Sequence, residues 1–396
     1  MSFRRIEDAP SGTTALVRVD FNVPMANGAV SDDTRLRAAL PTIRALQAKG
    51  CKIALLAHFD RPKGKVVPEM SLGQIMPGLA RVLDSVDGLV FVNDCVGDGV
   101  KGALSALPPG GVVLLENVRF YPGEEKNDPE FAKQLAANFD IYVNDAFSAA
   151  HRAHASTEGV AHILPAYAGK QMERELDALD AALGNPKRPV LGIVGGAKVS
   201  TKLDLLQNLI AKLDRLAIGG GMANTFLYAQ GHEIGGSLAE KDMADTARAI
   251  MEAAKGKCEI LLPVDVVVAK EVKPHTQARI AALGDIGADE KILDAGEKTV
   301  QRLREAMKRS HTLIWNGPLG VFEVPPFDQA TVIAAQEAAA LAKAGKLIAV
   351  AGGGDTVAAL NHAGVAGDFT FVSTAGGAFL EWMEGKALPG VEALRA

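Results

Sequence analysis

The chain has 396 residues, 48% hydrophobic and 22% charged, which excludes wholesale disorder and predicts about two to three globular domains. A formal net charge of −5 argues against general affinity for nucleic acid, and no uncharged apolar run is long enough to cross a bilayer. Three widely spaced cysteines, Cys51, Cys95 and Cys258, are typical of a reducing compartment and predict a cytoplasmic protein without a disulfide framework or zinc ribbon.

Short β-rich runs alternate with amphipathic helical patterns in the first half of the chain. Two helices are predicted around Pro41, with Gly50 capping the second, and Asp128-Pro129 predicts a helix that runs to about residue 138. Such alternation is typical of a parallel sheet covered by helices on both faces. The predicted strands are 15–19, 52–57, 89–92, 112–115 and 141–143.

The segment 170–183 is predicted to be one charged amphipathic helix, ended by Gly184-Asn185-Pro186. A second alternating series follows it. We therefore expect two α/β domains of similar size, with this helix as the connector between them. The second series of predicted strands is 190–194, 215–218, 259–262, 264–268, 312–315 and 347–351.

Basic side chains follow several predicted strands of the first half. Ligands of parallel α/β sheets bind outside the carboxyl ends of the strands, so these side chains are expected at one edge. Arginine forks match phosphate and carboxylate, and so many at one edge favour a small anionic ligand over a merely solvated surface. The residues concerned are Arg18, Arg35, Arg61, Arg119, Arg152, His58, His151 and His154.

Glycine-rich turns follow the strands of the second half, at 195–196, 219–221, 317–320 and 352–354. Glycines let backbone N–H groups approach phosphates at a helix N-terminus, although a single pair would indicate only a tight turn. Lys198 and Lys202 are expected one turn apart on such a helix, both facing the phosphates. Asp355 could hold Mg²⁺, directly or through water.

The motifs of other nucleotide-binding and metal-binding sites are absent from the sequence or incomplete in it. The chain contains no GxxxxGK[ST] and no HRD or DFG set, which excludes a P-loop enzyme and a protein kinase. A GxGxxG at 97–102, followed by Glu116, leaves a Rossmann dehydrogenase as an alternative, although it is not in the first βαβ unit. His151 and His154 permit a zinc pair, but no further ligand clusters with them, which favours support of a phosphate site.

Specific strings make the chain recognisable. It resembles the phosphoglycerate kinase family over essentially its whole length. The resemblance implies reversible transfer of the 1-phosphate of 1,3-bisphosphoglycerate to Mg-ADP, giving 3-phosphoglycerate and ATP, by direct in-line transfer on domain closure. The strings lie at 18–24, 116–120, 143–147, 150–156, 195–199, 315–323 and 353–356.

The resemblance also implies roles for individual residues. The 3-phosphoglycerate site is implied at Asp20, Phe21, Asn22, Arg35, His58, Phe59, Asp60, Arg61, Arg119, His151 and Arg152. The nucleotide site is implied at Lys202, Asn316, Glu323, Gly353, Gly354, Asp355 and Thr356, with Asp355 also directed toward Mg²⁺. The groups implied to steady the phosphoryl group during transfer are Arg35, Lys198, Gly376 and Gly377.

The implied fold is two doubly wound, Rossmann-like parallel-sheet domains joined by a helix and a hinge. We expect a substrate domain over 1–170, a connector and nucleotide domain over 171–375, and a segment over 376–396 that returns to the first domain. A monomer is expected, because no heptad seam is present, with small-molecule substrates and neither nucleic acid nor membrane as partner. The alternatives are the dehydrogenase and a non-catalytic binder of phosphorylated ligands.

Two departures from the family pattern stand out. Asp60 occupies the glycine position of the usual His-Leu-Gly-Arg-Pro, and we expect its carboxylate to point away from the substrate, capping or pairing with Lys63 or Lys65. The string at 373–379 is less rich in glycine and serine than usual, but it keeps the amides of Gly376 and Gly377.

Overall fold

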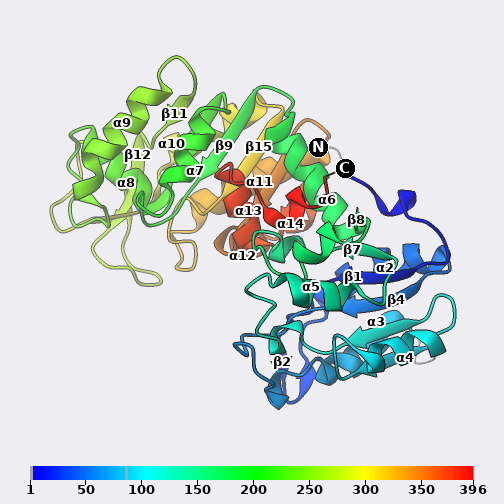
Figure 1. Ribbon diagram of the computed structural model, residues 1–396. Coiled ribbons are helices and arrows are strands. Elements are labelled where there is room, and N and C mark those ends of the chain that lie inside the picture. Colours follow the sequence, from blue (N-terminus) through cyan, green and yellow to red (C-terminus); the bar gives the residue numbers. More distant parts are fainter. Residues whose placement is uncertain (1–2, 85–87, 396) are drawn as a thin grey trace. The chain divides into compact units, whose positions relative to one another are not determined.

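The computed structural model describes residues 3–84 and 88–395 (Figure 1). The chain forms two compact units. The first unit extends to Asp177 and also takes in the segment from Ala387 onward, and the second is Ala178–Lys386. The first division lies 7 residues beyond the predicted 170, and the second lies 11 residues beyond the predicted 375. Residues 376–386 therefore belong to the second unit, and only the segment from Ala387 onward returns to the first.

The first unit is built on a six-stranded parallel sheet in the order β5-β6-β4-β1-β7-β8. The four inner strands are buried and form continuous apolar runs, which is why the sequence predicted them to within one residue. The edge strand β5 was also predicted, at 89–92. The sixth, β8, has only three residues and gave no periodic signal. The strands are β1 (Thr14–Arg18), β4 (Lys52–Leu56), β5 (Leu89–Val92), β6 (Val112–Leu115), β7 (Ile141–Asn144) and β8 (Ala166–Ala168).

Helices flank this sheet, and their ends follow the local chemistry. The break next to Pro41 separates α1 from α2, and Gly50, at φ +66°, ends the second helix. The Asp128 side chain accepts the N–H of Glu130 and caps α5, as predicted. The helices are α1 (Thr34–Ala38), α2 (Leu40–Ala48), α3 (Met76–Leu83), α4 (Asp98–Ala106) and α5 (Pro129–Ala136), and β2 (Met25–Ala26) pairs with β3 (Ala29–Val30) in a short hairpin.

The C-terminal segment completes the first unit. Helix α14 (Pro389–Glu392) lies in it, and the Gly390 N–H donates to the carbonyl of Ala150 at 2.8 Å. Phe3 and Arg395 form an isolated antiparallel bridge. Both ends of the described chain therefore belong to the same unit.

The second unit repeats the architecture with a parallel sheet in the order β11-β10-β9-β15-β16-β17. Together, the two helix-flanked sheets confirm the doubly wound α/β fold. The strands are β9 (Val190–Val194), β10 (Arg215–Ile218), β11 (Glu259–Leu261), β15 (Thr312–Asn316), β16 (Ile348–Gly352) and β17 (Phe371–Ser373).

One predicted strand lies in a different sheet. The run 264–268 forms β12 (Asp265–Ala269), which is the centre of a separate antiparallel sheet between β13 (Arg279–Ala282) and β14 (Lys291–Ala295). Its apolar sequence indicated burial correctly. It could not indicate direction, because strand direction depends on pairing with short strands that lie elsewhere in the chain.

The connector begins as α6 (Lys170–Leu179) and continues as one π-helical turn to Gly184, close to the predicted helix. Among the residues that the structure describes, no helix is both long and apolar enough to cross a membrane. The remaining helices are α7 (Leu203–Ile210), α8 (Gly220–Ala229), α9 (Ala244–Ala254), α10 (Glu297–Lys308), α11 (Gln329–Lys343), α12 (Gly354–His362) and α13 (Gly376–Met383).

Candidate active site

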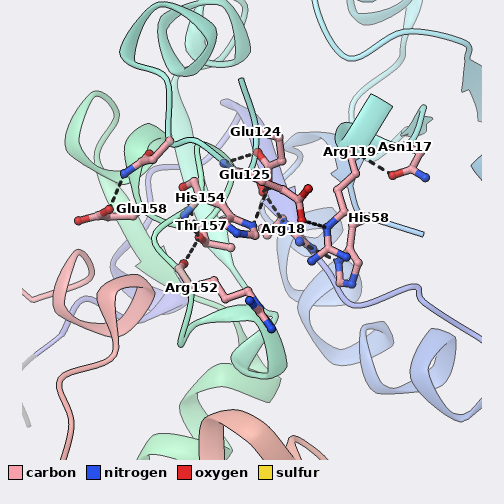
Figure 2. Close-up of polar contacts among 12 residues, drawn as sticks. Arg18, His58, Asn117, Arg119, Glu124, Glu125, Arg152, His154, Thr157 and Glu158 are labelled. Atoms are coloured by element: carbon pink, nitrogen blue, oxygen red, sulfur yellow. Dashed lines mark hydrogen bonds and ion pairs between the residues drawn. The ribbon is translucent and has the colours of Figure 1, made fainter. Parts of the chain in front are cut away.

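The basic residues of the first unit follow four neighbouring strands. Arg18 ends β1, His58 follows β4, Arg119 follows β6 and Arg152 follows β7. Because these strands are adjacent and parallel in the order β6-β4-β1-β7, their carboxyl ends meet at one edge of the sheet. The predicted gathering of cations is present there (Figure 2).

Arg18 and His58 form the buried part of this edge. Arg18 is fully buried and donates to the carbonyl of Val19 at 2.6 Å and to Nδ1 of His58 at 2.9 Å. Since a guanidinium can only donate, Nδ1 accepts and the proton of the neutral ring is on Nε2. Burial and the charge of Arg18 hold the pKa of His58 well below its ordinary value.

Arg119 and His154 lie close to Arg18 and His58, and their pKa values are lowered as well. Burial, reinforced by Arg18, lowers the pKa of Arg119, whose guanidinium donates to the carbonyl of Asp60 at 3.0 Å. Burial and the charge of Arg119 lower the pKa of His154 to about 4. Glu125 lies 3.8 Å from Nε of Arg119, and Glu124 lies 3.8 Å from Nδ1 of His154. The pKa values of Arg119 and His154 are lowered despite these acids, so positive charge still exceeds negative charge at this edge, which favours an anionic ligand.

Arg35 is held at the border of the cluster by acidic and backbone acceptors. It donates to the carboxylate of Asp20 at 3.1 Å and to the carbonyl of Asn22 at 2.8 Å. Asp20 also accepts the hydroxyl of Ser148 at 2.6 Å. In this structure, therefore, Asp20 orients Arg35.

The side chains of the other predicted substrate residues differ in how far they are exposed to solvent. Phe21 and Phe59 have 0% and 8% of their surface exposed and pack in the core, so only their backbone is available to a ligand. Arg61 and Arg152 are exposed, and His151 is half-buried.

The predicted pairing of Asp60 with a neighbouring lysine is not found, while the predicted direction of its carboxylate away from the substrate stays a prediction. Its carboxylate is exposed, and within the described residues it forms no ion pair with Lys63 or Lys65. Its backbone lies at φ +53°, in the left-handed region, and its N–H donates to the side chain of Asn22 at 3.0 Å. The turn thus needs a conformation that glycine adopts readily, which is a physical reason for glycine in the family pattern.

A cavity of about 500 Å³ opens in the second unit. Its glycines bring backbone close to backbone: a Cβ on Gly220 would lie 2.6 Å from the carbonyl oxygen of Gly196. Leu238, Leu293 and Val321 add apolar wall. The cavity suits a flat apolar group with a polar end, and its charged lining includes Lys291, Asp294, Glu323 and Asp355.

Lys202 lies beside this cavity. Its ammonium donates to the carbonyl of Gly195 at 2.6 Å and to the side chain of Asn316 at 2.7 Å. Burial lowers its pKa to about 8, and the charge of Asp355 opposes that shift. Asn316 in turn donates to the carbonyl of Gly352 at 2.9 Å, which ties the lysine to the turn that opens α12.

The expectation that Lys198 and Lys202 lie on one helix is wrong. The loop after β9 continues past both lysines, and α7 begins only at Leu203. Lys202, at φ −130° and ψ 20°, precedes that helix and lacks helical backbone angles. Lys198 is exposed, whereas Lys202 is half-buried.

Two helix N-termini meet in the second unit. Gly353, at φ +101°, precedes α12, and the hydroxyl of Thr356 accepts the N–H of Gly317 at 2.7 Å. A Cβ on Gly376, at the start of α13, would lie 3.6 Å from the backbone nitrogen of Gly354. Converging amides of two helix starts favour an anion such as phosphate.

The residues near α12 fit a nucleotide-borne magnesium ion. Asp355 presents an exposed carboxylate in the first turn of that helix. The described part of the chain holds no group of three or more His, Cys, Asp or Glu that could form an all-protein metal cage. Mg²⁺ commonly takes one or two carboxylates and completes its shell with phosphate oxygens and water, so a single aspartate is sufficient.

The GxGxxG at 97–102 lacks the packing that a dinucleotide fingerprint requires. A Cβ on Gly97, Gly99 or Gly102 would meet nothing within 4 Å. Glu116, the candidate ribose ligand, accepts the hydroxyl of Ser71 at 2.6 Å and the N–H of Leu72 at 2.8 Å. These glycines and this acid therefore have ordinary structural roles.

Several site residues were missed by the sequence analysis. Asn117 brackets Phe59 by accepting its N–H at 3.1 Å and donating to its carbonyl at 2.6 Å. Asp294 accepts the N–H of Ala330 at 2.9 Å, and burial raises its pKa to about 8. Asn117 lies in the string at 116–120 that carries the family resemblance, so a signal for it was present in the sequence. Asp294 carried no motif.

Comparison with known proteins agrees with this geometry. A family model described as phosphoglycerate kinase matches residues 6–386. The phosphoglycerate kinases of Caulobacter vibrioides and Zymomonas mobilis are 70% and 61% identical to the chain, with all of both sequences covered. The solved phosphoglycerate kinase of Coxiella burnetii is 41% identical with a TM-score of 0.93, covering 99% of this chain and 98% of that one. The chain belongs to the phosphoglycerate kinase family.

Proposed function

We propose that the first unit binds 3-phosphoglycerate, that the second binds ADP or ATP with Mg²⁺, and that the phosphoryl group passes directly between the two ligands. The family reaction is reversible phosphoryl transfer in glycolysis. The observation that supports this assignment most directly is the pair of arginines Arg18 and Arg119 at one sheet edge, where burial and their charges keep the neighbouring rings of His58 and His154 neutral. A ligand with a carboxylate and a phosphate would supply the missing negative charge.

The second unit offers complementary parts for a nucleotide. The base would enter the glycine-walled cavity, with Glu323 toward the ribose hydroxyls. The phosphates would meet Lys202 and the turn Gly353–Thr356. Asp355 would hold Mg²⁺, which neutralises phosphate charge when it is bound.

Transfer itself needs positioning and charge neutralisation, because an acyl phosphate is already activated. Arg35, Lys198 and the amides of Gly376 and Gly377 would act on the moving group. Reacting atoms must come within roughly 3–3.5 Å of each other, so ligands mounted on separate units react only after those units close around the connector helix.

A coupled assay tests the proposed reaction. With 3-phosphoglycerate, Mg-ATP and glyceraldehyde-3-phosphate dehydrogenase, NADH oxidation should depend on this protein and on both substrates. Nicotinamide binding without phosphoryl transfer would favour the dehydrogenase instead. Anion binding without turnover would favour a non-catalytic binder.

Small-angle X-ray scattering tests closure. The radius of gyration should fall most with 3-phosphoglycerate and a non-transferable Mg-nucleotide together, because both ligands are needed to neutralise the facing cations. Each ligand alone should have a smaller effect. An unchanged radius in the ternary complex would contradict a hinge.

We also propose that the enzyme works as a cytoplasmic monomer on small molecules, without nucleic acid or membrane partners. The net charge of −5 and three buried, free cysteines support this view. Analytical ultracentrifugation over a range of protein concentrations should show one species at the monomer mass of 41.4 kDa. A concentration-dependent dimer would contradict it.

A further inference from the structure

A buried acid lies among the cations of the first unit. Glu124 has 0% of its surface exposed, and none of the steps proposed above uses it. Its carboxylate accepts the N–H of Ser156 at 2.9 Å and the Ser156 hydroxyl at 2.5 Å. Burial raises its pKa, while Arg18 and the bonds from Ser156 oppose that shift.

Ser156 joins this acid to Arg18. The Ser156 hydroxyl accepts from Nε of Arg18 at 2.9 Å while it donates to Glu124. The guanidinium is thereby held at three places: at Ser156 through Nε, at the Val19 carbonyl and at Nδ1 of His58. Figure 2 shows this row of side chains from Glu124 through Arg18 to His58.

Attraction for the substrate does not explain Glu124. A negative charge beside an anion site weakens binding, and a buried carboxylate is costly unless it is well paired. Its hydrogen bonds instead hold Ser156, whose hydroxyl accepts from Nε of Arg18 and so restricts the direction of the guanidinium. A fixed planar fork then selects which nitrogen of His58 accepts.

We propose that Glu124 and Ser156 are positioning residues, which orient Arg18 and through it keep His58 as a neutral ring that offers its Nε2–H to the substrate. The identity of the substrate, 3-phosphoglycerate, rests on the proposed function. The tautomer of His58 does not, because it can be observed in the free enzyme.

Other charges also face His58. Arg18, Arg119, Arg35 and His154 all disfavour its protonation. Charge alone would keep the ring neutral but would not choose between its two nitrogens. Among the described hydrogen bonds, only that from Arg18 reaches the ring, so the choice of tautomer depends on the orientation of this one guanidinium.

Nuclear magnetic resonance of the full-length protein with ¹⁵N-labelled histidine measures the tautomer. The chain has 8 histidines, and His58→Gln identifies the signals of interest. The wild-type protein should show His58 with Nδ1 unprotonated and Nε2 protonated. In Ser156→Ala and in Glu124→Gln the two nitrogen shifts should move toward each other, as the tautomers mix.

Steady-state kinetics on the same variants separates positioning from simple charge. Both variants should raise KM for 3-phosphoglycerate by about tenfold, the usual effect of losing one hydrogen bond to a charged group. KM for ATP should stay within about twofold, because that site lies in the other unit. If Glu124 merely diluted the positive potential, Glu124→Gln would lower KM for 3-phosphoglycerate, which is the opposite sign.

Ser310→Ala is the matched control. Ser310 is also buried, and its hydroxyl donates to the carbonyl of Ala306 at 2.8 Å in the second unit. It should lower the melting temperature about as much as Ser156→Ala, while leaving the His58 signals and KM for 3-phosphoglycerate unchanged. Ser156→Thr, which keeps the hydroxyl, should restore the wild-type tautomer.

The outcomes are distinct. Unchanged His58 shifts in both Ser156→Ala and Glu124→Gln would overturn the proposal, and so would a lower KM for 3-phosphoglycerate in Glu124→Gln. Failure of the proposed function would show differently, as a wild-type protein without turnover in the coupled assay but with the tautomer changes intact.

Discussion

The two units offer opposite kinds of surface to the ligands proposed for them. The first unit presents polar and charged side chains, with Arg18, Arg119 and the neutral ring of His58 gathered at the end of a sheet. The second unit uses glycines, which have no side chain, so that backbone atoms at Gly196, Gly220 and Gly353 can come close to neighbouring atoms and to a ligand. A charged carboxylic acid and a flat base with phosphates make these different demands on a protein surface.

The difference predicts how each unit responds to mutation. Shortening a charged side chain in the first unit removes an attraction but leaves the backbone in place. Adding one methyl group at Gly220 in the second unit would displace backbone, because the nearest atoms are backbone atoms of Gly196 and not a flexible side chain that could move aside. The variants below test this contrast, in order of decreasing expected effect.

Lys198→Ala should have the largest effect, because Lys198 is the exposed charged side chain assigned to transfer in the glycine-built unit. Its charge is needed while the phosphoryl group moves, so kcat should fall by about 10²–10³ with both KM values nearly unchanged. Steady-state kinetics against Lys212→Ala, an exposed lysine after α7, supplies the comparison. Near-normal kcat with a raised KM for ATP would exclude the role.

Arg35→Ala should lower kcat by about 10² or more if it reaches the same moving group. Arg37→Ala is a close control, because Arg37 is on the same helix, is exposed and pairs with Asp33 at 2.8 Å. That variant should keep wild-type kinetics. Equal losses in the two variants would mean that damage to α1, and not a lost contact, is being measured.

Gly220→Ala should damage the nucleotide unit through its backbone. Its φ of +66° and a Cβ position 2.6 Å from the Gly196 carbonyl leave no room for a side chain. We expect a loss of about 1–3 kcal/mol in unfolding free energy and a KM for ATP raised about tenfold, with KM for 3-phosphoglycerate unchanged.

Gly99→Ala provides the matching glycine control for that experiment. A Cβ at Gly99 would meet nothing within 4 Å, and the residue lies inside α4. This variant should gain about 0.5–1 kcal/mol in unfolding free energy, measured by chemical denaturation. A gain at Gly220 as well would show that the cavity wall is not crowded.

Lys202 should make nucleotide binding sensitive to alkaline pH. Its pKa is lowered to about 8, so the ammonium is charged below that pH and loses its proton above it. The value of kcat/KM for ATP, which reports the free enzyme, should therefore fall above about pH 8, approaching tenfold per pH unit. In Lys202→Arg, which stays charged, the fall should disappear up to about pH 10.

Asp60→Gly should have the smallest effect. The turn holds Asp60 at φ +53°, so glycine relieves strain but loses more chain entropy on folding, for a net gain below about 1 kcal/mol. KM for 3-phosphoglycerate should change by less than about tenfold. Lys63→Gly, at φ +57°, tests the same strain without the carboxylate. A much larger gain in affinity at Asp60 would show that its carboxylate faces the substrate.

Features that depend on residues close together in the sequence could be predicted from the sequence. Buried parallel strands are continuous apolar runs, and the residues that follow them stand at one sheet edge, so β4 and His58 could both be anticipated. Short strands such as β8 and β17, and the direction of β12, depend on partners elsewhere in the chain.

The parts of the site that were not predicted depend on tertiary contacts. The hydrogen bonds that join Glu124 to Ser156 and Ser156 to Arg18 form only in the folded chain, and no residue spacing in the sequence predicts them. The lysine pair was misplaced because residue spacing gives a helical face only where a helix exists, and α7 begins at Leu203, after Lys202. A cavity lined by glycines is still harder to predict from the sequence, because glycine turns also occur where no ligand binds.

The returning C-terminal segment places a distant part of the chain next to the substrate loop. Gly390 donates to the carbonyl of Ala150, and its Cα is so near that a Cβ there would lie 3.0 Å from the Ala150 Cα. His151 and Arg152 follow immediately. A purification tag or fusion partner at this end, or proteolysis of the tail, would therefore disturb the backbone that supports these two residues. We expect such a change to alter the binding of 3-phosphoglycerate and to leave the second unit intact, although that unit is closer to the tail in sequence.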